Sequence, residues 1–177
     1  MNISVRSKRD TSDLLEVIHS KWPNHVVPKI KTFKAYEVEQ GRFILESEDM
    51  LAVQVDQKII LPFLGLPRIL EYFPAVYVDM GAVKFVCNGA KVMRPGITKF
   101  DHFTKGDIVI VKDQIHAKPL SVGIAMEDSD AAITKTKGYV IDIYTTLVIN
   151  FGKLTRKLRE VKGSYLDTQI FHAEIMS

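Results

Sequence analysis

A glycine-punctuated stretch from Val78 to Gly96, VDMGAVKFVCNGAKVMRPG, constrains the fold more than any other part of the sequence. The β-branched run that leads into it, Ala75 to Val78, predicts a short strand. Gly81 is expected to let the backbone turn tightly into a short helix. The Asn-Gly pair at 88–89 is expected to end that helix, because both residues tolerate the left-handed conformation. Lys91 to Met93 predicts a second strand, closed by a Pro-Gly turn.

One side of this short helix is predicted to face a core, since Val83, Val86 and Cys87 recur at helical spacing. Cys87 is the single cysteine of the chain, so no internal disulfide can form, and a reducing compartment is indicated. A buried structural thiol is favoured over a nucleophile at this position. Asp79, directly before the helix, is predicted to cap it rather than to act as a catalytic acid.

The same stretch resembles the PUA domain, a family named for pseudouridine synthases and archaeosine transglycosylases. The shared pattern is an apolar strand, an Asp, a Gly-Ala pair, a short helix, a second Gly-Ala pair and a Pro-Gly turn. Its matching residues are Val78, Asp79, Gly81, Ala82, Gly89, Ala90, Val92, Met93, Pro95 and Gly96. Residues 106–109 and 121–125 also resemble that family, so the likeness extends from about residue 74 to residue 150. It implies a mostly β pseudo-barrel.

The N-terminal residues predict a strand and an amphipathic helix. The alternation of Ile3 and Val5 predicts a short strand. The helix is expected to be capped within Asp10 to Asp13, with Glu16 at capping-box spacing, and to end before Pro23. Its apolar face carries Leu14, Leu15, Ile18 and Trp22. The tryptophan is expected to be a core anchor rather than a binding platform.

From Ile30 to Leu61 the period of the apolar residues changes to two, which predicts a small, largely antiparallel sheet. The pattern changes again between Pro62 and Pro74. We therefore expect an α+β chain with a small N-terminal α+β domain over residues 1–73, followed by a mostly β PUA-like pseudo-barrel over residues 74–152. A basic C-terminal extension over residues 153–177 completes the expected organisation.

Two further segments widen the resemblance. Leu66 to Pro74, and Ser7 to Asp10 before a leucine-rich helix, are similar to the malignant-T-cell-amplified-sequence family. Its members pair a small pre-PUA domain with a C-terminal PUA domain, and the chain resembles an archaeal member. Eukaryotic members act in translation re-initiation and ribosome recycling with a density-regulated-protein partner. The resemblance therefore implies a role in translation and a ribosome or translation-factor partner.

The C-terminal segment is a predicted basic helix. Its cations are Lys153, Arg156, Lys157, Arg159 and Lys162, opposed by a single acid, Glu160. Two interpretations stay open: a solvated helix face packed on the sheet, or an accessory element that contacts phosphates. The net charge of the whole chain, +3, is too small to decide between them.

The motifs of several enzyme classes are missing from the sequence. The five histidines are scattered, and one cysteine cannot build a structural zinc site. Glycine-rich phosphate loops and a Gly-x-Ser-x-Gly elbow are absent. No run approaches the ~20 apolar residues of a membrane span, and the N-terminus has no signal-peptide pattern. We expect a cytoplasmic, non-catalytic protein without cofactor or metal.

The predicted function is RNA binding in translation or RNA metabolism, on tRNA or rRNA, at a structured stem or end. Glycines allow a close approach of a nucleic-acid backbone, and the lysines and arginines beside them can neutralise phosphates. The resemblance implies that the short helix and the next strand face the RNA. The expected contacts are Gly81, Ala82, Lys84, Gly89, Ala90, Lys91, Arg94, Lys99, Arg156, Lys157 and Arg159.

Two alternatives stay open at this point. In one, the chain is a protein-interaction module whose N-terminal domain docks a translation-factor partner. In the other, it is an accessory subunit of an RNA-modification system.

Overall fold

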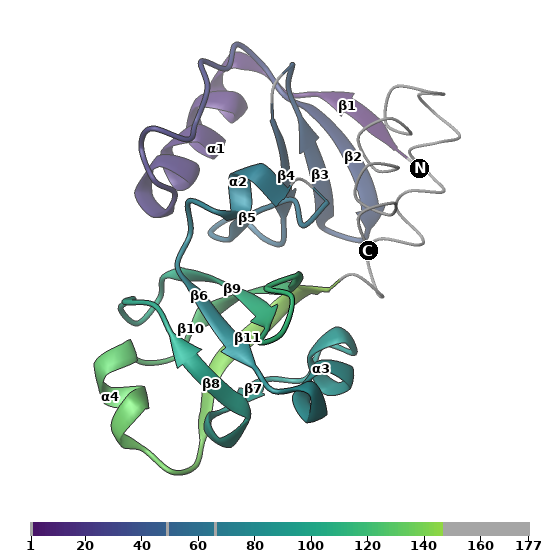
Figure 1. The fold of residues 1–177 in the computed structure, drawn as a ribbon. Helices are drawn as coiled ribbons and strands as arrows, with labels where there is room; N and C mark the ends of the chain where they lie inside the picture. Colours follow the sequence, from purple (N-terminus) through teal and green to yellow (C-terminus); the bar gives the residue numbers. More distant parts are fainter. Residues whose placement is uncertain (1, 49, 66, 147–177) are drawn as a thin grey trace. The chain divides into compact units, whose positions relative to one another are not determined.

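The computed structural model describes residues 2–48, 50–65 and 67–146. The chain divides into two compact units, Met1–Phe63 and Leu64–Ser177, which are coloured along the sequence in Figure 1. This division follows contacts between residues, whereas the boundary expected near residue 73 follows the sequence pattern. The precise domain limits therefore stay a prediction, and the expected basic extension lies outside the described residues.

The first unit is an α+β unit built on one antiparallel sheet. Its five strands lie in the order β1-β2-β3-β4-β5, so each strand pairs with the next one in the sequence. Short connections favour this arrangement, because consecutive antiparallel strands need only a tight turn between them. The elements are β1 (Ile3–Val5), α1 (Lys8–Lys21), β2 (Lys34–Glu39), β3 (Arg42–Glu46), β4 (Leu51–Gln54) and β5 (Ile60–Pro62).

Helix α1 begins earlier than the sequence predicted. Ser7 is its N-cap, and the Asp10 backbone N–H donates to the Ser7 hydroxyl at 3.1 Å while the Asp10 carboxylate accepts from the Ser7 backbone N–H. This reciprocal capping box uses Ser7 and Asp10, so the expected cap around Asp13 and Glu16 is wrong. The predicted end before Pro23 is confirmed, because α1 ends at Lys21.

The core of the first unit lies between α1 and the sheet. Ile18, Ala35, Leu45 and Leu61 have no measurable exposure. Trp22 is also buried and donates its indole N–H to the carbonyl of Ile60 at 2.8 Å, which confirms its predicted role as a core anchor. The indole therefore satisfies its only polar group inside the protein.

The second unit contains a six-stranded sheet with short helices. The strands lie in the order β7-β11-β10-β9-β6-β8, and every pair is antiparallel except β6–β9. The elements are α2 (Pro67–Leu70), β6 (Ala75–Val78), α3 (Met80–Cys87), β7 (Val92–Met93), a 3₁₀ turn (Arg94–Gly96), β8 (Ile97–Phe100), β9 (Ile108–Asp113), β10 (Pro119–Ala125), α4 (Ser129–Thr134) and β11 (Tyr139–Thr146).

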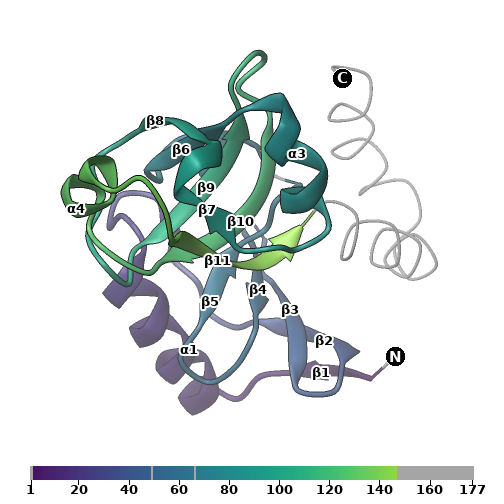
Figure 2. The same cartoon turned by 90° about the horizontal axis from the view of Figure 1, so that it is seen from below.

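This sheet must curl, because its two edge strands are neighbours in the sequence. Strands β7 and β8 lie at opposite ends of the strand order, yet only the 3₁₀ turn Arg94–Gly96 separates them. The sheet therefore bends round into a nearly closed pseudo-barrel, and Figure 2 shows α3 and α4 on opposite sides of it. The expected α+β class and PUA-like pseudo-barrel are confirmed.

The barrel core depends on one glycine in its central hairpin. The pairing of β10 with β11 shifts register between Val122 and Gly123. A Cβ built on Gly123 would lie 2.4 Å from the carbonyl oxygen of Asp142, far inside normal contact. A glycine at a bulge allows this close backbone approach. The surrounding core includes Val76, Val109, Val111, Val140 and Ile141, all without measurable exposure.

The turn between β9 and β10 corrects another predicted boundary. The apolar pattern of residues 116–126 predicts a strand that begins at His116, but β10 begins at Pro119. The Asp113 carboxylate accepts hydrogen bonds from the backbone N–H groups of Ile115, His116 and Lys118 at 2.6–3.0 Å. Such side-chain hydrogen bonds offer the backbone an alternative to strand pairing. They hold residues 114–118 as a turn.

Candidate functional site

The start of α3 is fixed by Asp79. This residue is the N-cap, and its Oδ1 accepts from the Ala82 backbone N–H at 2.8 Å, which confirms the predicted cap. Gly81 lies inside the first turn of α3 with a helical backbone, so the expected tight turn at Gly81 is wrong. A Cβ on Gly81 would lie 3.2 Å from Asp79 Oδ1. This glycine therefore leaves room for the cap.

The end of α3 follows the sequence prediction. Asn88 is the C-cap and Gly89 has a φ of 85°. The backbone N–H of Ala90 donates to Phe85 O at 3.0 Å, and that of Gly89 donates to Val86 O at 2.9 Å. These two bonds form a Schellman motif, which needs a residue in the left-handed region after the helix. The predicted role of the Asn-Gly pair is thereby confirmed.

A close contact joins the two ends of the glycine-rich stretch. The Asp79 N–H donates to the carbonyl of Gly96 at 2.9 Å, and a Cβ on Gly96 would lie 3.1 Å from the Cβ of Ala82. Small residues at both positions let the 3₁₀ turn pack against the start of α3. This contact explains why one Gly-Ala pair and a distant Pro-Gly turn occur together.

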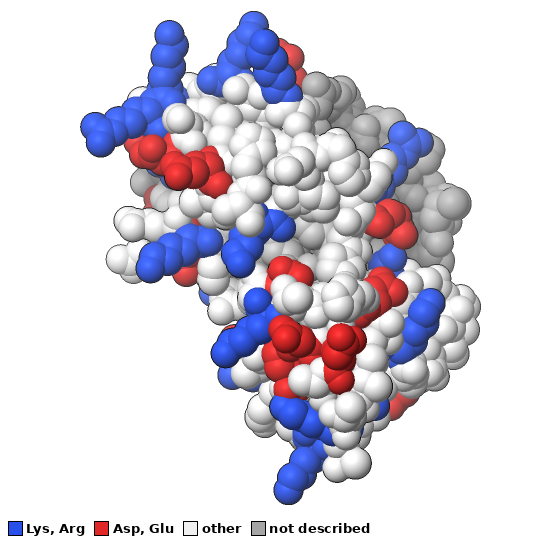
Figure 3. Space-filling view, turned by 90° about the vertical axis from the view of Figure 1, so that its left-hand side faces the viewer, with Lys and Arg blue, Asp and Glu red and all other residues white. Residues whose placement is uncertain are grey.

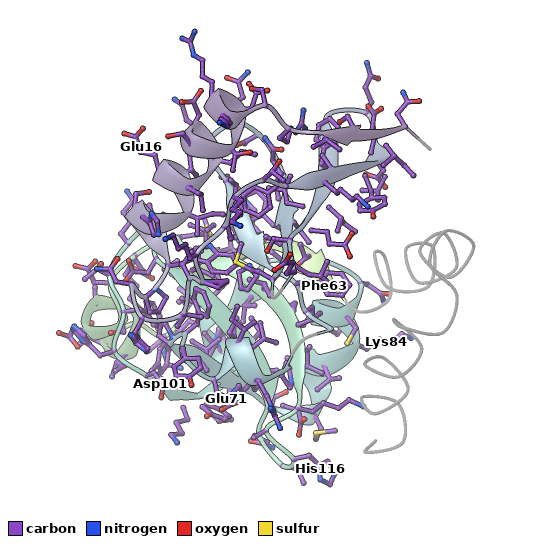
Figure 4. All side chains as sticks on the ribbon, turned by 90° about the horizontal axis from the view of Figure 1, so that it is seen from above. Glu16, Phe63, Glu71, Lys84, Asp101 and His116 are labelled. Atoms are coloured by element: carbon purple, nitrogen blue, oxygen red, sulfur yellow. The ribbon has the colours of Figure 1, made fainter. Side chains whose placement is uncertain are left out.

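Two of the predicted cationic residues are exposed beside this short helix. Lys84 lies on α3 and Lys91 lies directly before β7, and both side chains are exposed. Figure 4 shows Lys84 projecting outward from α3. Apolar side chains are exposed in the same stretch: Phe85 is 65% and Met93 49% exposed. We call this set the α3–β7 surface; it comprises Gly81, Lys84, Phe85, Ala90, Lys91 and Met93.

Arg94 is held by the protein itself. Its Nε donates to Ala132 O at 2.9 Å, its Nη1 to Ile97 O at 3.1 Å and its Nη2 to Ile133 O at 3.3 Å. The guanidinium also lies over the ring of Phe100, 5.0 Å from its centroid. Three donors are therefore committed to backbone carbonyls. This geometry favours a structural role over the expected grip on a phosphate.

The remaining predicted residues do not belong to the α3–β7 surface. Gly89 forms the left-handed end of α3, and Ala82 packs against Gly96. Lys99 lies on β8, the other edge strand, with its Nζ 4.7 Å from the ring centroid of Tyr77. Arg156, Lys157 and Arg159 lie outside the described residues. Whether any of these side chains contacts RNA stays a prediction.

Sequence reasoning missed the aromatic residue next to Lys91. Tyr139 begins β11 and pairs across the sheet with Met93. The Nζ of Lys91 lies 5.9 Å from the centroid of the tyrosine ring. The alternating, β-branched pattern from Tyr139 to Ile149 predicts a strand, but no local signal identifies β7 as its neighbour. This pairing is a product of the tertiary structure.

The only cysteine lacks the features of a nucleophile. Cys87 is half-buried and packs against the barrel core. Burial raises the pKa of its thiol, although the charge of Lys118 acts in the opposite direction. A raised pKa leaves less thiolate at neutral pH. The structural interpretation is thus supported, with less burial than expected.

Within residues 2–48, 50–65 and 67–146, no group of three or more His, Cys, Asp or Glu side chains is placed to bind a metal ion. The same residues form no helix with the length and apolarity needed to cross a membrane. Acidic and basic side chains lie close together in the lower half of the face drawn in Figure 3. The segment that forms α4 contains the acids Glu127, Asp128 and Asp130, of which Glu127 pairs with Lys135.

Comparison with known proteins gives the same architecture. The sequence pattern of the PUA domain matches residues 74–147. A hypothetical protein of Pyrococcus horikoshii superposes with a TM-score of 0.69 over 85% of this chain and 97% of that one, at 23% identity. A PUA-domain protein of Aeropyrum pernix K1 gives 0.66 over 88% and 92%, at 22% identity. At these identities the likeness concerns the fold alone.

Sequence relatives extend the comparison. An uncharacterized protein of Methanocaldococcus jannaschii is 33% identical over 138 residues, which are 76% of this chain and 85% of that protein. Translation machinery-associated protein 20 of Saccharomyces cerevisiae is 32% identical over 80 residues, 41% of this chain and 44% of its own length. A probable tRNA pseudouridine synthase B of Pyrobaculum calidifontis is 33% identical over 85 residues, 48% of this chain but 24% of that protein.

The first of these relatives is matched over most of its length, whereas the two named for translation and tRNA modification are matched over less than half of theirs. The matched PUA pattern, the capped short helix and the pseudo-barrel all lie in the second unit, which follows a small α+β unit in the sequence. On these grounds the chain belongs to the PUA-domain proteins of the malignant-T-cell-amplified-sequence type.

Proposed function

We propose that this protein is a non-catalytic RNA-binding protein of translation or RNA metabolism, which binds structured tRNA or rRNA through the α3–β7 surface. The observation that carries the proposal is the exposure of Lys84 and Lys91 at a short helix that holds Gly81 in its first turn and ends at Gly89. Lysines of this kind neutralise phosphates and position a nucleic acid without reading its sequence.

The distribution of charge supports this choice of surface. Among the described residues of α3 and β7, the acid next to the lysines is Asp79, whose carboxylate caps α3. The segment that forms α4 instead has Asp128 and Asp130 exposed, which would repel phosphates. Phosphate binding is therefore favoured on the α3 side of the pseudo-barrel.

The names of two relatives are consistent with the proposal. One is associated with the translation machinery and the other is named for tRNA pseudouridine synthesis. Both share with this chain a segment of 80 to 85 residues, and the PUA pattern accounts for residues 74–147 here. A binding role that belongs to the shared segment fits both names, whereas catalysis belongs to the unshared remainder in this proposal.

A second candidate function is protein interaction through the first unit. Strand β1 is an edge strand, and its apolar residues Ile3 and Val5 are 50% and 65% exposed. Edge strands offer unpaired backbone groups to a partner chain. A ribosomal or translation-factor partner could be recognised there. This candidate differs from RNA binding in its salt dependence, because apolar contacts do not weaken as salt rises.

Titration of labelled tRNA at two salt concentrations tests the RNA-binding proposal. We expect the double variant Lys84→Gln/Lys91→Gln to lose about tenfold in affinity, and its salt slope to fall by about two units, since each phosphate contact contributes about 0.9. The matched control is Lys29→Gln/Lys31→Gln, which removes the same charge from exposed positions of the first unit.

The control separates a local surface from a general charge effect. We expect the control variant to bind within about twofold of the parent, because it removes no proposed phosphate contact. An equal loss in both double variants would show that only net charge matters, and no binding by the parent would favour the protein-interaction candidate. Crosslinking in cell extract, followed by sequencing of the bound RNA, would then identify the RNA.

A further inference from the structure

An aromatic ring is exposed beside the proposed RNA surface. Tyr139 is 53% exposed and Met93, its partner across β7–β11, is 49% exposed. The neighbouring residues Val92 and Ile141 point inward and are buried. Tyr139 and Met93 therefore lie on the outer face of the barrel, next to one another, where they contribute little to the core.

The surroundings of the ring are cationic and open. Lys91 Nζ lies 5.9 Å from the ring centroid, at the outer limit of a cation–π contact. Gly138 precedes the tyrosine with a φ of 104°, and a Cβ built on it would meet no atom within 4 Å. Lys137, before that glycine, is also exposed. Space, positive charge and an aromatic face thus occur together at the start of β11.

We propose that Tyr139, flanked by Met93, is a stacking platform for one unpaired nucleobase, and that Lys91 binds the phosphate next to that base. Every nucleobase has a flat π face, so an exposed aromatic ring beside cations binds unpaired bases without reading their identity. The present contact between Lys91 and the ring is long. The flexible lysine therefore leaves the ring face to the base and keeps its charge nearby for the phosphate.

This inference rests on the proposed RNA binding and makes it more specific. Paired A-form RNA hides its base edges and stacks its bases internally, so only a single-stranded end, loop or bulge can offer a free base. The preferred ligand is then a stem that carries a short single-stranded extension. A fully paired stem would use the lysines but not the tyrosine.

Three hairpin RNAs test the platform: one with a 3′ single-stranded extension, the same RNA with abasic extension nucleotides, and a blunt stem. For the parent protein we expect about tenfold tighter binding of the extended RNA than of its abasic version, within the range of base–aromatic stacking. Tyr139→Ala is expected to abolish this difference. Tyr139→Phe is expected to keep it, because the ring alone carries the stacking.

A spectroscopic readout separates stacking from structural effects. The chain has one tryptophan, Trp22, which is buried in the first unit. Tyr139→Trp therefore adds a second indole at the platform, and its emission is expected to be quenched by the extended RNA but not by the abasic one. Tyr72→Ala, at another exposed tyrosine of the second unit, is the matched control and is expected to bind like the parent.

The failure of this inference differs from the failure of the proposed function. If the parent binds all three RNAs equally and Tyr139→Ala changes none of them, the platform is wrong while RNA binding stands. If the added indole of the Tyr139→Trp variant responds equally to the abasic RNA, stacking is likewise overturned. If the parent binds none of the three RNAs, both the proposed function and the stacking platform are wrong.

Discussion

Two adjoining regions of the second unit, the α3–β7 surface and the 3₁₀ turn Arg94–Gly96, use cations in opposite ways. On the α3–β7 surface, Lys84 and Lys91 are exposed to solvent. In the 3₁₀ turn itself, Arg94 donates three hydrogen bonds to backbone carbonyls, two of which belong to α4. The comparison teaches that the chemical type of a residue does not reveal its role. The neighbours decide whether its charge is free for a ligand.

The largest expected effect comes from breaking the pseudo-barrel on which both regions depend. Gly123→Val would place side-chain atoms against the carbonyl of Asp142, and we expect a loss of about 3 kcal/mol in the free energy of unfolding. Urea unfolding followed by far-UV circular dichroism measures this loss. Ser121→Ala, on the same strand, is the control.

The Ser121 hydroxyl is buried without a hydrogen-bond partner in the described part of the chain. Its removal should therefore leave stability nearly unchanged, because a buried unsatisfied polar group contributes nothing favourable. If Gly123→Val unfolded at the same urea concentration as the parent, the close backbone contact at the bulge would not constrain the barrel.

Substitution of Arg94 is expected to lower the stability of the protein rather than its affinity for RNA. Arg94→Ala removes three hydrogen bonds from a charged donor, and we expect a loss of about 2 kcal/mol in the free energy of unfolding. Arg94→Lys should recover only part of it, because one ammonium group cannot reproduce the fork of the guanidinium. Chemical denaturation gives the stabilities.

RNA titration of the folded Arg94 variants then sharpens the comparison. We expect Arg94→Ala to lose less affinity than the Lys84→Gln/Lys91→Gln double variant. A large loss of affinity at unchanged stability would instead place Arg94 among the phosphate-binding residues.

The turn held by Asp113 is linked to the start of α3, because the neighbouring Gln114 N–H donates to Val78 O just before that helix. The pH dependence of stability at Asp113 therefore tests this part of the second unit. Burial acts to raise the pKa of Asp113. Hydrogen bonds from the backbone N–H groups of His116, Lys118 and Ile115 act to lower it, and together they outweigh burial, so the pKa lies below its usual value. A lowered folded-state pKa means that the stabilisation is present above about pH 4 and is lost as pH falls toward the folded pKa.

We therefore expect Asp113→Asn to lower the free energy of unfolding by about 1 kcal/mol at neutral pH. The difference from the parent should shrink as pH falls below about 4, because the unfolded state then binds a proton that the folded carboxylate, with its lowered pKa, does not yet bind. Thermal melts of both proteins between about pH 2 and pH 7 measure it. Because Asp10 in α1 also has a lowered pKa, the difference between the two proteins, and not the parent curve alone, is the relevant quantity.

The smallest expected effect compares one lysine from each side. Lys91→Gln should weaken tRNA binding about threefold to fivefold, as expected for one lost phosphate contact. Lys135→Gln should change it by less than about twofold, because Lys135 already forms an ion pair with Glu127 on the α4 side. Fluorescence anisotropy at low salt resolves this difference. Equal losses would remove the distinction between the two sides.

Much of the backbone was predictable because its signals are local. The strand–helix–strand order around α3, its Asp79 cap and its Asn-Gly end each depend on residues within a few positions of one another. The same holds for the alternating strands of the first unit. The errors at Ser7, Gly81 and residues 116–118 are also local. There, competing side-chain hydrogen bonds or packing displaced the expected boundary or gave a glycine a different role.

The sequence by itself determined the family pattern and the class of fold, and it placed Lys84 and Lys91 within a larger set of candidate RNA-binding residues. Only the tertiary structure decided that Arg94 is held by Ala132, which lies 38 positions away, and that Tyr139 stands beside Met93 and Lys91. Both outcomes follow from closure of the sheet, which brings β7 against β11 and the 3₁₀ turn against α4. A pattern of neighbouring residues carries no information about such distant partners, because the contacts exist only after the barrel has closed.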